Sequence, residues 1–435
     1  MKPHQEYKDS GVEWCPSIPS HWDVLKTKFL FKQVSIRDSA DEELLSIYRD
    51  YGVVPRYSRD DNFNRPAEDL TNYKLVRKGF LVINKMKAWQ GSIALSDLQG
   101  IVSPAYITCE PTANFYGRYF HYLYRSQLYI QEWNRLSQGI RPSQWDLSYE
   151  DFSQTPAFFP PLSEQQAIAD FLDCKTAQVD MLIEKKQRQI DLLQEQRTAL
   201  INHAVMKGLN PNVPMKDSGV EWFEEIPSDW KVLPLKRVVQ KFVDYRGHTP
   251  VKTDSGVLLI TARNIRDGKL DFETSKEYIA VDNYDSWMVR GLPEKGDVMV
   301  TTEAPLGATA QIEEEYVALA QRLILLKTDK SQMDNTFLKY YFLSQAGQHE
   351  LYSQATGSTA LGIKASKFYN INIVIPPLKE QQKIVEYLTG EETRILSLKK
   401  RIEEIIGLLR EYRTALISEA VTGKVDVRGW KTVHE

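Results

Sequence analysis

The chain has few of the features that mark secreted or membrane proteins. Its 435 residues include only three cysteines, Cys15, Cys109 and Cys174, which are too few and too scattered for a disulfide framework or a cysteine metal site. Charged residues make up 26% of the sequence and no run of about 18 apolar residues occurs, so no membrane-spanning segment is expected. The N-terminal residues lack the basic and then apolar pattern of a signal peptide. We therefore expect a soluble, cytoplasmic protein.

The motifs of common nucleotide-dependent and metal-dependent enzymes are also missing. The sequence has no Gly-x-x-x-x-Gly-Lys-Ser/Thr phosphate loop, and its seven histidines include no pair at metal-binding spacing. The nearest approach to the Asn/Asp-Pro-Pro-Tyr/Phe motif of adenine methyltransferases, residues 210–212 (NPN), departs at its third position. Residues 293–297 (PEKGD) match a nuclease acidic cluster only by composition, and we interpret them as a turn before a strand. We therefore expect no catalytic residue and no metal ligand.

Basic residues are not in excess. Lysine and arginine number 55 against 58 acidic residues, a formal net charge of -3, whereas nucleic-acid-binding proteins usually carry a basic excess that displaces counterions from phosphates. Between Pro55 and Trp145, however, 12 basic residues stand against 7 acidic ones, a local excess of 12 - 7 = +5. The sequence therefore permits a nucleic-acid-binding surface in this segment, and acidic surface elsewhere would suit protein partners.

The strongest positive feature is an internal repeat. Two opening motifs return 208 positions later, and two later motifs return 216 positions later: KDSGVEW at 8–14 and 216–222, IPS-x-W at 18–22 and 226–230, PPL-x-EQQ at 160–166 and 376–382, and RTALI at 197–201 and 413–417. The stretches between them, about 24–158 and 232–374, barely resemble each other. Two similar frames therefore carry two different inserts.

Each frame ends in a long predicted helix. Ser163 and Gln166 match a capping box after two prolines, and the chain then runs to about Ala204 without proline or glycine. A helix of this length extends for roughly 60 Å. Apolar residues at heptad spacing predict a coiled-coil seam between the two helices, formed by Leu172, Val179, Leu182, Leu193, Leu200, Leu388, Ile395, Leu398, Ile402, Ile405, Leu409, Tyr412 and Leu416. The alternative is that each helix simply packs on its own domain.

The two inserts predict α+β domains. They contain short β-like runs such as residues 80–84 and 297–301, and each has one expected helix, at 116–136 and 335–352. The predicted fold is therefore α+β, with two mixed α/β domains joined by two long helices in a coiled coil and related by a pseudo-twofold repeat. The expected boundaries are 1–160 for the first domain, 161–207 for the first helix, 208–375 for the second domain, 376–424 for the second helix and 425–435 for a C-terminal tail.

This organisation resembles the specificity subunits of type I restriction-modification enzymes. The resemblance spans nearly the whole chain and rests on the paired KDSGVEW, PPL-x-EQQ and RTALI motifs, together with GFLVINKMKAWQGS at 79–92, GIVSPAY at 100–106 and GDVMVTTEAPLG at 296–307. It implies that the two long helices form an antiparallel coiled coil and that each domain recognises one half of a split double-stranded DNA target. It also implies docking of two adenine methyltransferase subunits and, through them, restriction/translocase subunits. S-adenosylmethionine, ATP and Mg would then be bound by those partners, with no cofactor bound by this chain.

Direct readout of bases requires cations and amides on loops of a rigid scaffold. The candidate DNA-contacting residues in the first domain are Lys85, Lys87, Gln90, Arg141, Ser143 and Gln144. Those in the second domain are Arg246, His248, Thr249, Arg263, Asn264, Arg322, Ser358, Thr359 and Lys364. Each could instead belong to an ordinary solvated loop, and Arg322 could equally be paired with a carboxylate at a strand end.

Three other functions remain open from the sequence. The chain could be the recognition subunit of a type IIB-like system, in which one partner combines nuclease and methyltransferase. It could also be a coiled-coil adaptor with two protein-binding heads, which the acidic balance favours slightly. A transcription regulator is a third alternative, although the sequence has no helix-turn-helix signal.

Overall fold

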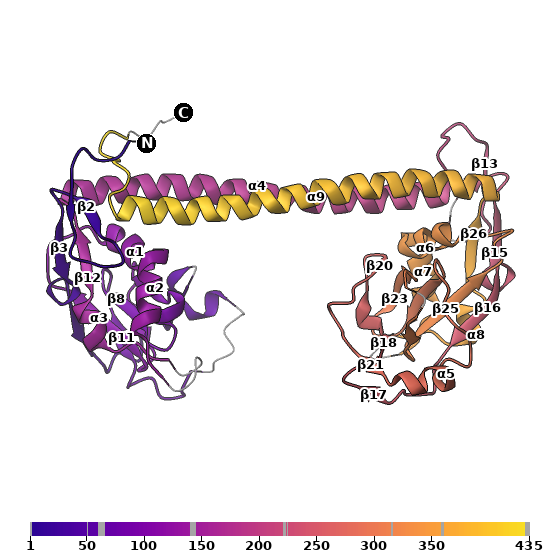
Figure 1. The fold of residues 1–435 in the computed structure, drawn as a ribbon, viewed down its shortest axis with the longest axis horizontal. Coiled ribbons are helices and arrows are strands. Elements are labelled where there is room, and N and C mark those ends of the chain that lie inside the picture. Colours follow the sequence, from indigo (N-terminus) through magenta and orange to yellow (C-terminus); the bar gives the residue numbers. More distant parts are fainter. Residues whose placement is uncertain are drawn as a thin grey trace. The chain divides into compact units, whose positions relative to one another are not determined.

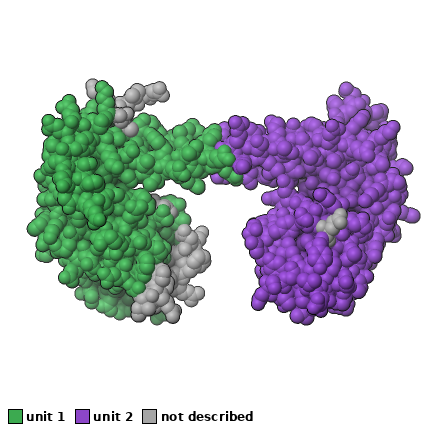
Figure 2. Space-filling model, viewed as in Figure 1, with its two compact units in different colours: residues 1–186, 403–435 green, residues 187–402 purple. Residues whose placement is uncertain are grey.

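The structure is a computed structural model that describes residues 2–49, 51–59, 66–139, 145–220, 223, 225–314, 316–357 and 361–430. The chain divides into two compact units, one of residues 1–186 and 403–435 and the other of residues 187–402 (Figure 2). Each unit contains one mixed α/β domain and half of each long helix (Figure 1). Within the described part of the chain, no helix is long and apolar enough to cross a bilayer.

The first unit is built around a four-stranded antiparallel sheet in the order β4-β11-β8-β9. Apolar residues of this sheet pack against helices α1 and α2 to form the main core. The domain's elements are β1 Tyr7–Asp9, β2 Ser17–Pro19, β3 Asp23–Lys26, β4 Phe31–Val34, β5 Leu45–Tyr48, β6 Gly52–Pro55, β7 Lys74–Val76, β8 Leu81–Asn84, β9 Ile93–Leu95, β10 Gly100–Val102, β11 Tyr106–Pro111, β12 Pro156–Phe159, α1 Gly117–Arg125, α2 Gln127–Leu136 and α3 Tyr149–Gln154.

The second unit repeats this arrangement, with a sheet in the order β16-β25-β22-β23 and a second four-stranded sheet beside it. Its elements are β13 Met215–Asp217, β14 Glu225–Pro227, β15 Lys231–Pro234, β16 Val239–Asp244, β17 Lys252–Thr253, β18 Val257–Ile260, β19 Ile265–Arg266, β20 Lys269–Leu270, β21 Tyr278–Ile279, β22 Val298–Thr302, β23 Leu306–Gln311, β24 Ala318–Leu319, β25 Leu323–Thr328, β26 Asn372–Ile375, α5 Tyr284–Trp287, α6 Asn335–Leu343, α7 Gln345–Ser353 and α8 Ala365–Phe368. The two inserts thus share a sheet topology, although their sequences barely resemble each other.

The one helix expected in each insert is two helices. Ser126 separates α1 from α2, and Ser344 separates α6 from α7. Both serines have extended backbone, and each hydroxyl donates to a carbonyl three residues earlier. Serine forms such local bonds readily, which favours a break in the helix over its continuation.

The long helices are α4, Leu162–Lys207, and α9, Leu378–Val421. In the first unit Phe171 near the start of α4 shares a core with Val421 at the end of α9. In the second unit Val205 near the end of α4 shares a core with Leu388 near the start of α9. The helices therefore run antiparallel in each unit.

Helix α4 begins at Leu162, so Ser163 lies inside its first turn and is not the N-cap. The neighbouring glutamine has the structural role instead. Gln165 is fully buried, accepts from the Tyr116 amide at 2.8 Å and donates to the Pro160 carbonyl at 2.8 Å. Gln381, the repeat equivalent, accepts from the Asp334 amide at 2.8 Å. The repeated glutamine therefore ties each domain to the start of its helix.

The predicted seam is buried at five positions, namely Leu172, Val179, Leu388, Ile395 and Leu416. Five more are partly buried, namely Leu193, Leu200, Leu398, Ile402 and Leu409. Leu182, Ile405 and Tyr412 are 46%, 39% and 49% exposed, and Ile406 is buried in place of its neighbour. A helix with 3.6 residues per turn drifts against a strict seven-residue repeat, so one assignment of the seam cannot hold along 44 residues.

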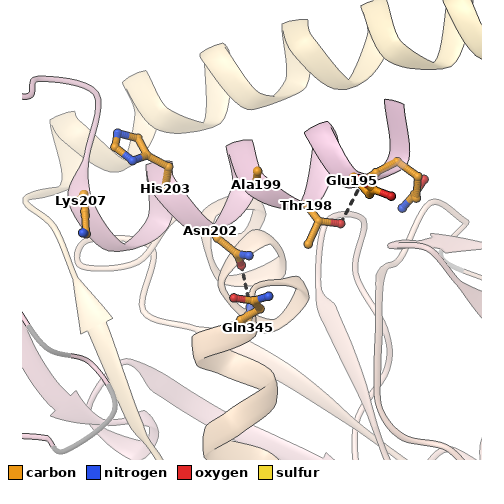
Figure 3. Close-up of a pocket in the computed structure, with 8 residues that line it drawn as sticks. Glu195, Thr198, Ala199, Asn202, His203, Lys207 and Gln345 are labelled. Carbon is orange, nitrogen blue, oxygen red and sulfur yellow. Dashed lines mark hydrogen bonds between the residues drawn. The ribbon is translucent and has the colours of Figure 1, made fainter. Parts of the chain in front are cut away.

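Polar contacts also hold domain 2 on α4. The Gln345 amide at the start of α7 donates to Asn202 Oδ1 of α4 at 2.7 Å (Figure 3). The same stretch of α4 presents Thr198, His203 and Lys207 along a groove beside this contact (Figure 3). This bond and the Gln381 contacts fix domain 2 at two points on the helix pair.

Candidate nucleic-acid interface

The candidate loops of the first unit meet at one edge of its sheet. Asn84 at the end of β8 pairs with Tyr106 at the start of β11, and the loop 85–90 follows directly. A second loop is closed by a bridge between Gln138 and Asp146 and is attached to the first, because the Leu147 amide donates to the Lys85 carbonyl at 3.0 Å. The described ends of the second loop are thus attached to the loop that follows β8.

The second unit has the same construction. Thr302 ends β22 at the edge where β25 begins, and the turn to β23 follows. A loop closed by a bridge between Thr356 and Gly362 is attached there, because the Ile363 amide donates to the Thr302 carbonyl at 3.0 Å. Asp244 at the end of β16 lies at this edge too. Matching loops of the two units therefore occupy matching positions although their sequences differ.

A cationic cavity of about 610 Å³ lies beside the loops of the first unit. Its cations are Arg49, Arg56, Arg59 and Lys87, and none of the described residues that line it carries a carboxylate. Its amides are Asn84 and Gln90, and its aromatic side chains are Tyr48, Tyr51, Tyr73 and Tyr106. The Arg59 guanidinium lies 4.1 Å from the centre of the Tyr51 ring. Burial raises the pKa of Tyr106, so its phenol stays neutral. Such a lining can bind phosphates and also donate to and accept from base edges.

Three of the cavity's cations were not among the candidates from sequence. Arg49, Arg56 and Arg59 lie on or next to the β5–β6 hairpin, which packs beside β8 only in the folded domain. The signal in the sequence was the alternation of tyrosine and arginine over residues 48–59. That alternation is characteristic of surfaces that stack on bases and neutralise phosphates.

The predicted residues of the first unit fall into three groups. Lys87 and Gln90 are exposed and line the cavity. Lys85 donates to Asp146 at 2.7 Å with both side chains 39% exposed, so it holds the two loops together. Arg141, Ser143 and Gln144 lie outside the described residues.

In the second unit Arg263, His248 and Lys364 are exposed. Thr249 donates to Gln321 at 3.0 Å, and Arg322 lies 3.3 Å from Glu303 with its side chain 52% exposed. Loops that are distant in the sequence are thereby brought together. Ser358 and Thr359 lie outside the described residues.

The structure corrects the prediction for two candidates of the second unit. Asn264 is fully buried, accepts from Thr261 and donates to the carbonyls of Asp271 and Ser275, so it cannot reach DNA. The Arg246 guanidinium is occupied by both oxygens of Asp244 and by the Ile363 carbonyl. Both residues were chosen because their loops are polar, but their side chains stabilise those loops.

The acidic segment 293–297 is the turn before a strand that the sequence indicated. The Glu294 amide donates to Asp297 Oδ2 at 2.9 Å, and β22 begins at the next residue. Burial raises the pKa of Asp297, against the opposing effect of Lys327 at 3.0 Å. This segment has a structural explanation and needs no catalytic one.

Comparison with known proteins agrees with this architecture. The chain is similar to the MjaVIII type I restriction enzyme specificity subunit of Methanocaldococcus jannaschii, with 24% identity over 94% of each protein. Its fold is similar to a chain from a solved type I R-M system (TM-score 0.68, 17% identity, covering 94% of this chain and 99% of that one). It is also similar to the HsdS subunit of Thermoanaerobacter tengcongensis (TM-score 0.54, 18% identity, 94% and 98% covered). The family model described as "Type I restriction modification DNA specificity domain" matches residues 19–192 and 227–406, so the chain belongs to that family.

Proposed function

We propose that this chain is the DNA sequence-specificity subunit of a type I restriction-modification complex, and that each unit recognises one half of a bipartite double-stranded target. The observation that carries this proposal is the cationic cavity at the loop edge of the first unit, with four cations and no carboxylate among its described lining. Carboxylates in the lining would repel phosphate, whereas the four cations of this lining attract it. Lys87 and Gln90 lie where a base edge could be read.

In the second unit the same role falls to the loops at the matching sheet edge. Arg263, His248 and Lys364 are exposed polar side chains of this unit, and Arg322 could exchange Glu303 for a phosphate because both are half exposed. Exposed ion pairs contribute little energy, so breaking this one costs little.

The chemistry of the complex belongs to partners in this proposal. Two adenine methyltransferase subunits would bind S-adenosylmethionine, and restriction/translocase subunits would bind ATP and Mg, while this chain contributes recognition without catalysis. A complex that acts on chromosomal DNA would work in the cytoplasm. The similarity of the chain to specificity subunits of type I restriction enzymes supports this proposal.

The test is reconstitution. The purified chain should transfer no methyl group and hydrolyse no ATP, and sequence-specific methylation should appear once a modification subunit and S-adenosylmethionine are added. Gel shifts of the assembled complex at low and high salt should show salt-dependent DNA binding. Methyl transfer by the chain alone, or an assembled complex without DNA affinity, would contradict the proposal; the second result would favour a protein adaptor.

A further inference from the structure

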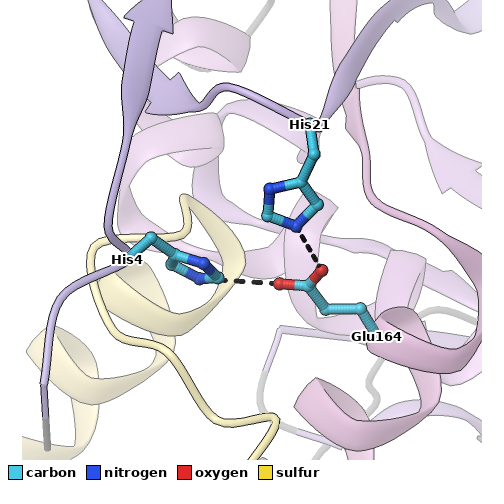
Figure 4. Close-up of side chains that lie close together, drawn as sticks. All are labelled: His4, His21 and Glu164. Carbon is cyan, nitrogen blue, oxygen red and sulfur yellow. Dashed lines mark hydrogen bonds and ion pairs between the residues drawn. The ribbon is translucent and has the colours of Figure 1, made fainter.

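Three side chains that are far apart in the sequence form a compact cluster in the first unit. His4 precedes β1, His21 follows β2, and Glu164 lies in the first turn of α4 (Figure 4). Each offers one donor atom, and these atoms all lie within 4.8 Å of one another. His21 Nε2 lies 2.7 Å from Glu164 Oε2, and His4 Nε2 lies 3.5 Å from Glu164 Oε1.

The cluster has unsatisfied polar atoms in its interior. The His4 side chain is 2% exposed, yet among the described residues neither of its ring nitrogens makes a hydrogen bond, and the same holds for Glu164 Oε1. The next carboxylate, Asp426, lies 3.9 Å from His4 Nδ1 and is paired with Arg428. Leaving a buried polar group unbonded costs roughly 1–3 kcal/mol, so such a group calls for a partner.

The repeat supplies an internal comparison. Glu380, the counterpart of Glu164, accepts a hydrogen bond from the Trp230 indole at 3.0 Å. In the first unit the counterpart indole, Trp22 Nε1, is buried and makes no hydrogen bond within the described part of the chain. Glu164 bonds to the imidazole of His21 instead. The second copy has no imidazole at either position, because Asn212 stands where the first has His4 and Asp229 where it has His21.

We propose that His4, His21 and Glu164 bind one divalent transition-metal ion, and that this ion is Zn²⁺. Imidazole nitrogen and carboxylate oxygen are ordinary zinc ligands, at about 2.0–2.2 Å from the ion. Donor atoms around a tetrahedral ion at that distance lie roughly 3.3 Å apart. The 3.5 Å separation of His4 Nε2 and Glu164 Oε1 fits, and the donor atoms of all three residues, which lie within 4.8 Å of one another, need to approach by at most about 1.5 Å. A water molecule would complete the coordination.

The surroundings suit such an ion. Burial lowers the pKa of His4, against the opposing charges of Asp426 and Glu164. Asp426 beside His4 Nδ1 is placed to act as the outer hydrogen-bond acceptor that commonly orients a ligating histidine.

The ion would connect three segments of the first unit, two through its ligands and the third through Asp426. His4 belongs to the N-terminal segment, Glu164 to the start of α4, and Asp426 to the segment after α9. Existing links between these segments include the pairing of Lys2 with Asp426, the bond from the Tyr7 hydroxyl to the Gly423 carbonyl at 3.1 Å, and the packing of Phe171 against Trp430. A bound ion would therefore stabilise the folded unit in proportion to its affinity.

The experiment uses the full chain, stripped of metal with a chelator and titrated with Zn²⁺ by calorimetry and with Co²⁺ by visible absorption. We expect one equivalent of either ion, a tetrahedral Co²⁺ spectrum, and a rise in melting temperature with Zn²⁺. His4→Asn, which copies the residue of the second repeat, and His21→Asn should each weaken Zn²⁺ binding by more than the roughly 10–100-fold that loss of an outer-shell partner causes. His203→Asn, at an exposed histidine of α4, is the matched control and should bind as the parent does.

Two results would overturn the proposal. One is the absence of stoichiometric Zn²⁺ binding and of a Co²⁺ spectrum in the parent chain, which needs no variant to fold. The other is binding of unchanged affinity in a His4→Asn/His21→Asn double variant whose circular dichroism matches the parent, since the ion would then lie elsewhere.

Discussion

Arg197 of α4 and Glu392 of α9 form a charge-assisted pair that also holds the second domain. Arg197 Nε donates to Glu392 Oε1 at 2.9 Å, and the Tyr340 hydroxyl of α6 donates to Glu392 Oε2 at 3.0 Å. Arg197 Nη2 further donates to the Asp267 carbonyl at 3.1 Å. The two charged side chains are 11% and 13% exposed. One cluster therefore connects both long helices and the domain within the second unit.

Glu392→Gln should destabilise the second unit because it removes the charge that compensates a mostly buried guanidinium. Loss of one partner from a fully buried pair costs roughly 3–5 kcal/mol, and with the remaining exposure we expect about 2–3 kcal/mol. Urea unfolding and hydrogen–deuterium exchange of α6 would measure the loss. Glu195→Gln is the control, since the Arg188–Glu195 pair is 61% and 62% exposed and such pairs contribute under about 1 kcal/mol. Equal effects of both variants would show that burial does not set the strength of the Arg197 pair.

The same pair makes stability depend on pH. Burial would raise the pKa of Glu392, but the hydrogen bonds and charge of Arg197 outweigh it, so the pKa lies below its usual value. A carboxyl whose pKa is lower in the folded state stabilises the fold above its unfolded pKa, about 4.3, and loses that contribution as pH falls through the folded pKa. The stability difference between the parent and Glu392→Gln should therefore be constant from about pH 7 to 6 and shrink below about pH 4. A difference that grows on acidification would contradict this assignment.

The sequence was sufficient to predict the elements that repeat. The paired motifs and the heptads predicted two domains and two long helices that pack on each other, because repeated motifs and an apolar period can be recognised without knowledge of tertiary contacts. Local hydrogen bonds were harder to predict. Ser163 was expected to cap α4, whereas the helix begins at Leu162 and Gln165 has the structural role. A serine in a capping pattern can lie at the N-cap or inside the first turn of the helix. Only the contact between Gln165 and Tyr116 shows which residue has the structural role.

The sequence located the loops of the candidate site better than it identified the residues that line the cavity. The loops after β8 and β18 were correctly placed beside strands, so Lys87 and Arg263 are exposed there. Asn264, next to Arg263, is buried because a short helical turn needs its amide for two carbonyls. Arg56 reaches the cavity only through the β5–β6 hairpin, and His4 reaches Glu164 only through the packing of the chain's ends. The tyrosine and arginine alternation over residues 48–59 was a local signal for Arg56, whereas the contact between His4 and Glu164 leaves no local pattern.

Substitutions in the two units should impair recognition of different half-sites. Lys87→Ala should impair recognition of one half-site and Arg263→Ala that of the other, because each residue is exposed in its own unit. A base-edge contact should cost about 1–3 kcal/mol and relax specificity at one position, whereas a phosphate contact should weaken all sequences alike and reduce the salt slope by about one. Methylation assays on targets altered in one half would measure both effects. Equal loss at both halves from either variant would indicate damage to folding or assembly instead.

The length of the helices offers a test of how the two half-sites are spaced. Helices α4 and α9 both continue from one unit into the other. Seven residues inserted into each, between Lys186 and Leu193 and between Ile402 and Leu409, preserve the heptad phase and the seam. Each helix becomes about 10 Å longer, and at about 3.4 Å per base pair the preferred half-sites should be separated by ~3 additional base pairs.

The inserted chain should keep both half-site sequences while its spacing changes. Three extra base pairs also rotate the groove by more than a quarter turn, so the DNA must untwist or the protein must bend, and affinity should fall even at the new spacing. Insertion into α4 alone should be worse, because seam residues lose their facing positions on α9. Methylome sequencing of cells that carry the doubly extended chain measures the spacing directly. Efficient modification at the parental spacing would mean that loop reach or DNA bending, and not helix length, determines the distance between half-sites.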